Sequence, residues 1–337
     1  MKIKFHIAAS VSTVLTLHSA LGQGALTPPG APAPVMKSLD QIEARTIVNS
    51  ANTPGDGTNL FIISQPGSYY LTANVVPFRF LGGTAKNGIE ITANNVTLDL
   101  NGFAMQGAMG NSGIYIPYAQ TNITVRNGTI SGWAANGIDS ASSSSWNQVF
   151  ERLNISTCGD DGVTSYGTAA VRDCNCENNT EDGIDCFGGG IISGCMVNKN
   201  GFDGIQMGGG TISGCSVQLN GNIGILVVVG STVSGCYVEW NTANGIFLDA
   251  TGCAVIGNTC YANNIAINDS NNRVEGNHVT VNGYAGIQVY AGGLSNVIIK
   301  NSVSGNGAGN YVVPAGNDLG PVGTAATATS PWANISH

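Results

Sequence analysis

The chain has 337 residues, of which only 9% are charged, and its formal net charge is −8 at pH 7. This negative balance argues against nucleic acid and anionic membrane surfaces as partners. So few charges together with 48 glycines are often a sign of disorder, but the regular alternation of apolar residues described below excludes it.

Residues 1–24 are predicted to form a secretory signal peptide. Lys2 and Lys4 give the charged start, residues 7–17 give an apolar core, and Ala-Leu-Gly at residues 20–22 gives a cleavage site. The apolar run is too short to span a membrane. We therefore expect no membrane insertion and export to the periplasm, the cell surface or the extracellular medium.

Residues 25–84 are predicted to form a Pro-rich linker followed by an N-terminal cap. The linker reads LTPPGAPAPV at residues 26–35, and two strands are expected within residues 61–76, around Gln-Pro-Gly-Ser at 65–68. The open end of a stacked sheet attracts other strands, so we expect this segment to cover it.

Residues 85–306 carry an internal repeat, and a period of 20–25 residues indicates one structural unit stacked along an axis. A Gly followed by Ile or Val recurs at this period, with one member missing near Asn264-Ile265. Counting the missing member predicts about ten coils. The repeat glycines are Gly88, Gly113, Gly137, Gly162, Gly183, Gly204, Gly224, Gly245 and Gly286.

Each repeat is predicted to contain short strands bounded by Gly and Asn corners. Ile184 and Cys186 alternate with polar residues, as expected of strands with one buried face. No sustained helical period occurs, so the fold class is all-β, a parallel β-solenoid whose coils stack about 4.8 Å apart. The six-residue repeat of left-handed β-helices is absent, and a 21–25-residue coil fits a right-handed helix with three strand faces. Residues 307–337 lose the repeat and are expected to form a C-terminal tail or cap.

Two further residue types recur at fixed repeat positions, and both are interpreted as structural. One column consists of cysteines, which we expect to be reduced and packed inside the solenoid, because free Cys is among the most buried residue types. The other consists of asparagines, whose amides can hydrogen-bond between coils. The columns are Cys174, Cys195, Cys215 and Cys236, and Asn179, Asn200, Asn220, Asn241, Asn263, Asn282 and Asn306.

The repeating unit Asn/Asp-x-Gly-Ile…Val/Ile-x-Gly-Cys/Asn-x-Val-x-x-Asn resembles the right-handed parallel β-helix repeats of the pectate-lyase superfamily. The resemblance covers residues 85–306, and the flanks LTPPGAPAPVMKSLDQIEAR, ISQPGSYYLTANV and SPWANIS resemble those of secreted bacterial members. It implies a right-handed parallel β-helix. It implies function weakly, because the superfamily includes lyases, hydrolases, epimerases and adhesins.

Asp161, Asp182 and Asp203 share one repeat position, directly before the repeat Gly, so their charges would stack at about one strand spacing. Three alternatives would relieve the repulsion. The side chains could bind calcium, shift their pKa values upward, or splay into water at an exposed corner. Calcium is the only cofactor that the sequence suggests.

Asp139 and Asp185 lie two residues after their repeat glycines and are expected to point outward. They are two coils apart, about 9–10 Å between backbones, close to the separation of roughly 6.5–9.5 Å between the carboxylates of inverting glycosidases. Tyr166 and Phe187 are expected to face outward on adjacent coils, and Trp146 to form a low wall beside them. Acids next to aromatic rings are common where sugars bind.

Two functions remain open from the sequence. The first is a non-catalytic protein that binds polysaccharide or has a surface or structural role. The second is a polysaccharide-active lyase or glycoside hydrolase that uses Asp161, Asp182, Asp185 and Asp139, with or without calcium. Only His278 and His337 follow the predicted signal, which disfavours His-based triads. Of the polygalacturonase motifs, only the Asp-Asp pair at residues 160–161 is present.

Overall fold

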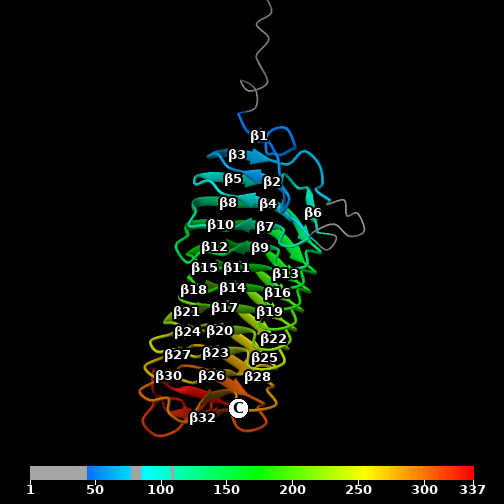
Figure 1. Cartoon of the computed structure of the whole chain (residues 1–337). Coiled ribbons are helices and arrows are strands. Elements are labelled where there is room, and N and C mark those ends of the chain that lie inside the picture. Colours follow the sequence, from blue (N-terminus) through cyan, green and yellow to red (C-terminus); the bar gives the residue numbers. More distant parts are fainter. Residues whose placement is uncertain (1–43, 77–84, 108–109) are drawn as a thin grey trace, which may run out of the picture. The chain divides into compact units, whose positions relative to one another are not determined.

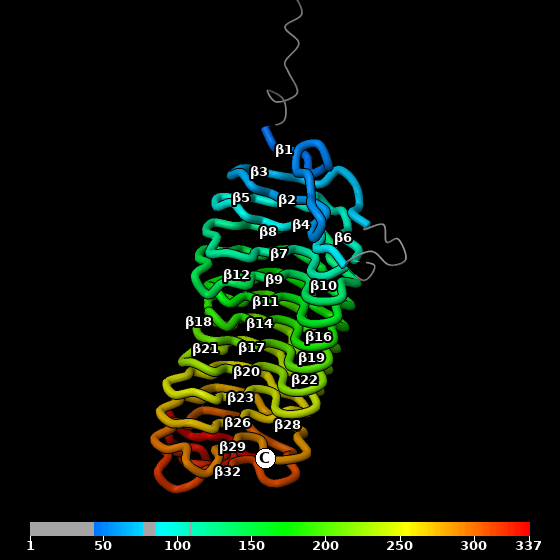
Figure 2. The backbone as a smooth tube through the Cα atoms, viewed as in Figure 1, coloured from blue at the N-terminus to red at the C-terminus, as the bar shows by residue number. Residues whose placement is uncertain are grey.

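The computed structural model describes residues 44–76, 85–107 and 110–337, and residues 45–337 form one compact unit. The predicted signal peptide, most of the Pro-rich linker and residues 77–84 lie outside the described residues. The unit is a stack of parallel β-coils (Figures 1 and 2). No helix that could cross a membrane occurs in the described parts of the chain.

One face of the solenoid is a parallel sheet of twelve strands, one from each coil. The solenoid therefore has about twelve turns rather than the ten predicted, because β2 and β32 add a coil at either end. The twelve strands in spatial order are β2 (Asn59–Ile63), β4 (Asn87–Ile91), β7 (Ile114–Ile116), β9 (Ile138–Ser140), β11 (Val163–Ser165), β14 (Ile184–Cys186), β17 (Ile205–Met207), β20 (Ile225–Val227), β23 (Ile246–Leu248), β26 (Ile265–Ile267), β29 (Ile287–Val289) and β32 (Tyr311–Val312).

The other two faces belong to a single sheet of 23 strands. Two long strands, β8 (Thr121–Ser131) and β10 (Trp146–Ser156), run across both faces. The second face also contains β1 (Thr46–Ile47), β3 (Gly67–Tyr70), β5 (Val96–Asp99), β12 (Ala169–Arg172), β15 (Gly190–Ser193), β18 (Gly210–Ser213), β21 (Ser231–Ser234), β24 (Ala254–Ile256), β27 (Arg273–Glu275), β30 (Val297–Ile299) and β33 (Asp318–Leu319).

The third face contains the shorter strands that follow the corner at the end of the second face. At its C-terminal end β35 pairs with both β31 and β34. These strands are β6 (Ala104–Gln106), β13 (Asn175–Glu177), β16 (Met196–Asn198), β19 (Ser216–Gln218), β22 (Tyr237–Glu239), β25 (Thr259–Tyr261), β28 (His278–Thr280), β31 (Ser302–Ser304), β34 (Val322–Gly323) and β35 (Asn334–Ser336).

The corner between the second and third faces depends on a residue with positive φ. Gly194 separates β15 from β16 with φ of 64°, and Gly214 separates β18 from β19 with φ of 61°. Glycine adopts this left-handed conformation without a Cβ penalty. The apparent second strand of each repeat is therefore two strands joined by a sharp corner, which gives the coil its three faces.

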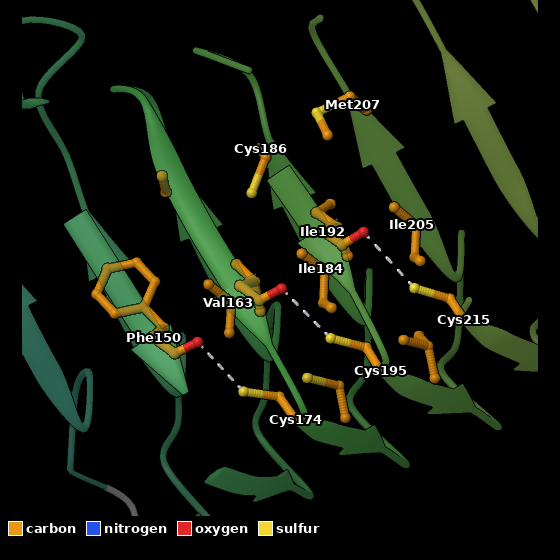
Figure 3. Close-up of a cluster of buried hydrophobic side chains, with 14 of the residues drawn as sticks. Phe150, Val163, Cys174, Ile184, Cys186, Ile192, Cys195, Ile205, Met207 and Cys215 are labelled. Carbon is orange, nitrogen blue, oxygen red and sulfur yellow. Dashed lines mark hydrogen bonds between the residues drawn. The ribbon is translucent and has the colours of Figure 1, made fainter. Parts of the chain in front are cut away.

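The inside of the solenoid is filled by ladders of apolar side chains, one from each coil. Ile184, Ile205 and Ile225 lie in register and are fully buried, which confirms the predicted strand phase. All nine cysteines are buried and free. Cys195 lies just after the corner Gly, and its thiol donates to the carbonyl oxygens of Ser193 at 3.4 Å and Val171 at 3.6 Å (Figure 3). The packing interpretation of the cysteine column is confirmed.

The asparagine column forms a hydrogen-bonded ladder at the corner between the third face and the twelve-stranded sheet. The backbone N–H and the Nδ2 of Asn200 both donate to Oδ1 of Asn220 at 3.0 Å, and Asn220 repeats the pattern with Asn241. Except at Asn282, each amide thus satisfies a buried backbone donor of the coil before it. This confirms its structural role.

Candidate functional site

The outer surface of the twelve-stranded sheet carries a polar stripe over its N-terminal half. Side chains alternate across a strand, so the middle residue of each three-residue strand points away from the core. Strand register aligns these middle residues on successive coils. The polar stripe consists of Glu90, Tyr115, Asp139, Thr164, Asp185 and Gln206, on β4, β7, β9, β11, β14 and β17.

A second column, the acidic column, consists of Asp161, Asp182 and Asp203 at the corner that leads into this sheet. Oδ1 of Asp161 accepts the backbone N–H of Asp182 at 2.8 Å, and Oδ1 of Asp182 accepts that of Asp203 at 2.7 Å. Oδ1 of Asp203 accepts the backbone N–H of Ile223 at 2.9 Å. Each carboxylate therefore holds the corner of the next coil, as an asparagine does at the neighbouring corner.

Asp182 and Asp203 are buried and Asp161 is partly buried, so the alternative in which the carboxylates of the acidic column splay into water is wrong for Asp182 and Asp203. Asp182 is 6% exposed and Asp203 is fully buried, and Oδ2 of Asp203 has no hydrogen-bond partner in the described residues. The inward direction follows from the hydrogen bonds, because a side chain that accepts from the next coil cannot also extend into solvent. The repulsion between these stacked acids must be relieved in another way.

Burial shifts the pKa values of these acids upward. Removal from water raises the pKa of Asp161 to about 6, against the opposing hydrogen bond from Thr164 Oγ1 at 2.7 Å. Burial and then the charge of Asp161 raise the pKa of Asp182 to about 8 and that of Asp185 to about 7. Burial also raises the pKa of Asp139. Near neutral pH this cluster therefore holds protons that ordinary carboxyl groups would have lost.

The polar stripe and the acidic column are connected through hydrogen bonds and charge. Thr164 links them through its bond to Oδ2 of Asp161, and Gln206 Nε2 donates to Oδ1 of Asp185 at 3.3 Å. Asp185 is only 5% exposed although it faces outward. The stripe therefore presents carboxyl groups that are fixed by neighbours rather than freely mobile in water.

An aromatic pair borders the stripe. The rings of Tyr166 and Phe187 stack with centroids 5.1 Å apart and planes inclined by 10°, and both side chains are nearly half exposed. Burial, followed by the charges of Asp185 and Asp139, raises the pKa of the Tyr166 phenol, which places this ring beside the stripe. The expected outward direction of both rings is confirmed.

Trp146 begins β10 on the second face and is 62% exposed. Its turn is adjacent to that of Tyr166, since the N–H of Thr168 donates to the carbonyl of Ser145 at 3.0 Å. The structure thus brings Asp139, Asp161, Asp182 and Asp185 together with the aromatic pair. Trp146 lies at the next corner without a ring contact to that pair within the described residues.

No group of three or more His, Cys, Asp or Glu side chains in residues 44–76, 85–107 and 110–337 is arranged to hold a metal ion. In the acidic column every Oδ1 already accepts a backbone N–H. A calcium ion there would have to use Oδ2 atoms or displace these bonds. Calcium binding by Asp161, Asp182 and Asp203 stays a prediction.

Sequence reasoning did not include four members of the stripe, namely Glu90, Tyr115, Thr164 and Gln206. All four occupy the repeat position of Asp139 and Asp185, two residues after the repeat glycine, so the spacing alone could have identified them. Burial raises the pKa values of Glu90 and Tyr115 as well. Asn59 Nδ2 donates to Glu90 Oε2 at 2.6 Å and fixes the N-terminal end of the stripe.

Comparison with solved structures shows the same architecture in proteins of very different sequence. The A-module of the Azotobacter vinelandii mannuronan C-5 epimerase AlgE4 aligns with a TM-score of 0.59 at 14% identity, covering 87% of this chain and 89% of that one. The Dettilon tailspike protein gp208 aligns with a TM-score of 0.59 at 18% identity, covering 77% of this chain and 61% of the tailspike. At these identities the likeness concerns the fold alone.

No curated protein matches the chain by sequence. A protein family does: the family described as "Right handed beta helix region" matches residues 78–212 and 208–320, which together cover most of the chain. The twelve-turn parallel solenoid, with three strand faces and no helix in its described part, agrees with that description. The chain belongs to the right-handed β-helix family.

Proposed function

We propose that this protein binds a polysaccharide along the polar stripe of the twelve-stranded sheet. The observation that carries the proposal is the stacked, exposed Tyr166–Phe187 pair beside carboxyl groups that are fixed by hydrogen bonds. Flat aromatic rings pack against the apolar faces of sugar rings, while carboxyl and amide groups hydrogen-bond to sugar hydroxyls. The epimerase named above acts on a polysaccharide, which is consistent with this use of the fold.

The length and protonation of the stripe define the ligand further. Its six members lie on successive coils, so the stripe spans roughly 24 Å at the usual strand spacing. This length fits several sugar units that run parallel to the solenoid axis. Because the pKa of Asp185 is raised to about 7, this carboxyl group both donates and accepts hydrogen bonds near neutral pH. A neutral or sparsely charged glycan suits such a surface.

Binding to a panel of purified polysaccharides, measured by affinity electrophoresis and calorimetry, tests the proposal. Replacing Tyr166 or Phe187 by Ala should weaken binding of the ligand at least tenfold. Trp332→Ala is the matched control, because Trp332 is an exposed aromatic residue at the C-terminal end, away from the stripe. A protein that binds no polysaccharide, or aromatic variants that bind like the parent, would contradict the proposal.

A second candidate function is a polysaccharide-active enzyme, either a lyase or a glycoside hydrolase. It is favoured by one observation: Asp185, whose pKa is raised to about 7, lies close to Tyr166 and two coils from Asp139. A group that titrates near the working pH is suited to general acid–base catalysis. The two outward acids are separated by about two strand spacings, roughly 9–10 Å between backbones.

The two candidates are distinguished by products. Incubation with each polysaccharide that binds, followed by assays for reducing ends and for unsaturated sugars, detects hydrolysis or elimination. The enzymatic candidate predicts that Asp185→Asn removes product formation while binding persists. Binding without any product from the parent protein would leave the non-catalytic function.

A further inference from the structure

One coil of the solenoid is three residues shorter than its neighbours at a single corner. In the coils before and after it, the corner asparagine lies four positions ahead of the residue that precedes the next strand of the twelve-stranded sheet, as Asn241 does relative to Gly245. In the short coil Asn263 is followed directly by Asn264. Strand register fixes this gap, because β26 pairs normally with β23 and β29.

The missing residues leave a hollow of about 220 Å³ between the coils above and below. Gly283 shows the gap directly: a Cβ built on it would meet nothing within 4 Å. At the same repeat position on complete coils, a Cβ on Gly201 would collide with the carbonyl of Thr180, and one on Gly221 with the carbonyl of Gly201. The hollow is lined by Asn241, Thr242, Ala243, Ala262, Asn263, Asn264, Asn282, Gly283 and Tyr284.

Two backbone donors lose their partners at this gap. In a complete coil, the N–H groups of Gly201 and Phe202 donate to the carbonyls of Asn179 at 2.8 Å and Glu181 at 3.1 Å. The corresponding N–H groups of Gly283 and Tyr284 have no hydrogen-bond partner among the described residues. Both N–H groups belong to the coil that follows the gap. The acceptor for Tyr284 would have come from the three missing residues, whereas the acceptor for Gly283 would be the carbonyl of Asn263, which is present but does not accept this bond.

The asparagine ladder is broken at the same place. Nδ2 of Asn263 donates to the carbonyls of Asn241 at 2.8 Å and Ala243 at 3.1 Å instead of to the next asparagine. Oδ1 of Asn282 is therefore buried without a partner, on a residue that is only 5% exposed and lines the hollow. A buried acceptor without a donor is unfavourable until a partner supplies one.

These groups define the chemistry of a ligand. The hollow offers two N–H donors, none of its lining residues is charged, and Tyr284 at its edge is 78% exposed, while the unpaired Oδ1 of Asn282 is buried behind its wall. An uncharged ligand with several hydroxyl groups, each able to donate and accept, and one flat apolar face would satisfy both donors and the exposed ring. We propose that the hollow binds a single neutral sugar ring. This inference rests on the proposed function in assuming a saccharide ligand, but uses residues outside the polar stripe.

Titration of the purified protein with methyl glucoside, methyl galactoside, methyl mannoside and N-acetylglucosamine, followed by saturation-transfer NMR and calorimetry, tests the inference. At least one probe should bind, and Tyr284→Ala should weaken it at least fivefold. Phe202→Ala is the matched control, since Phe202 is an exposed ring at the same repeat position on a complete coil. Binding that is lost equally in both variants, or absent in the parent, would overturn the inference.

A second variant fills the hollow without removing any residue. Inserting the tripeptide Thr-Ala-Asn between Asn263 and Asn264 restores the corner found at residues 242–244 and should abolish probe binding while circular dichroism stays unchanged. Probe binding that survives in the folded insertion variant would refute the site. If the insertion does not fold, the comparison of Tyr284→Ala with Phe202→Ala decides. Tyr166→Ala should leave probe binding intact, so failure of the stripe and failure of the hollow give different results.

Discussion

Replacement of Asp182 by Asn is the sharpest test of the buried acidic column. The pKa of Asp182 is raised from 3.8 to about 8, chiefly by burial and next by the charge of Asp161. A folded-state pKa above the unfolded value means that the folded protein binds the proton more tightly. The resulting stability is fully present below about pH 4 and is lost as the pH rises through 8.

The size of the effect follows from the shift. Each tenfold change in proton affinity corresponds to about 1.4 kcal/mol. Between pH 5 and pH 9, ionisation of Asp182 should therefore lower the free energy of unfolding by an amount on the order of 4 kcal/mol. Asn keeps the Oδ1 acceptor that holds the N–H of Asp203 but has no charge to bury. Asp182→Asn should match the parent near pH 5 and exceed it in stability near pH 9.

Urea unfolding at pH values from 5 to 9, followed by circular dichroism, measures this difference as a change in midpoint. Asp160→Asn is the control, because Asp160 is an exposed acid two residues before the repeat glycine whose side chain makes no hydrogen bond in the described residues. Its pH profile should follow that of the parent. If Asp182→Asn loses stability with rising pH as steeply as the parent, the pKa of Asp182 is not raised in the folded protein, and the prediction is wrong.

Three further predictions concern packing and ions. Cys215→Ala should lower the free energy of unfolding by about 1–2 kcal/mol, because a small buried group is lost. The native thiol should resist alkylation. A Cys195–Cys215 disulfide found by mass spectrometry would contradict the packing interpretation. Ile205→Asp should unfold the protein, since it buries an unpaired charge, whereas Gln206→Asp should retain the fold; equal loss of thermal stability in both would contradict the register. If the acidic column binds calcium, the melting temperature should rise with calcium concentration and stop doing so once all three acids are Asn; a calcium-independent melting temperature would leave the column as hydrogen-bonded corners.

The architecture could be predicted because every coil repeats the same few constraints. An inward position mostly holds an apolar side chain, so the period of Gly-Ile pairs indicated both the solenoid and its register. The predicted number of coils was too low because the first and last coils lack the repeat glycine. The coils of β2 and β32 carry Leu60 and Asn310 where the others carry the repeat glycine, so a search for that glycine does not find them.

The candidate site was less predictable, because alternation shows which way a side chain points but not what covers it. Asp185 was correctly assigned to the outer face, yet it is almost fully buried there. The corner acids were expected in water because Asp is common in exposed turns. Whether Oδ1 of Asp161 meets solvent or the N–H of Asp182 depends on the next coil, which the sequence of one turn does not contain.

The polar stripe and the acidic column end at the same coil. The stripe stops at Gln206, and the next outward residues, Leu226 and Phe247, are apolar. The acidic column stops at Asp203, and Ile223 occupies the following position. Stacking of the coils does not require the stripe or the acids, since the later coils stack in the same register without acids at these positions. The shared boundary supports the proposal that these two connected columns form one site in the N-terminal half of the sheet.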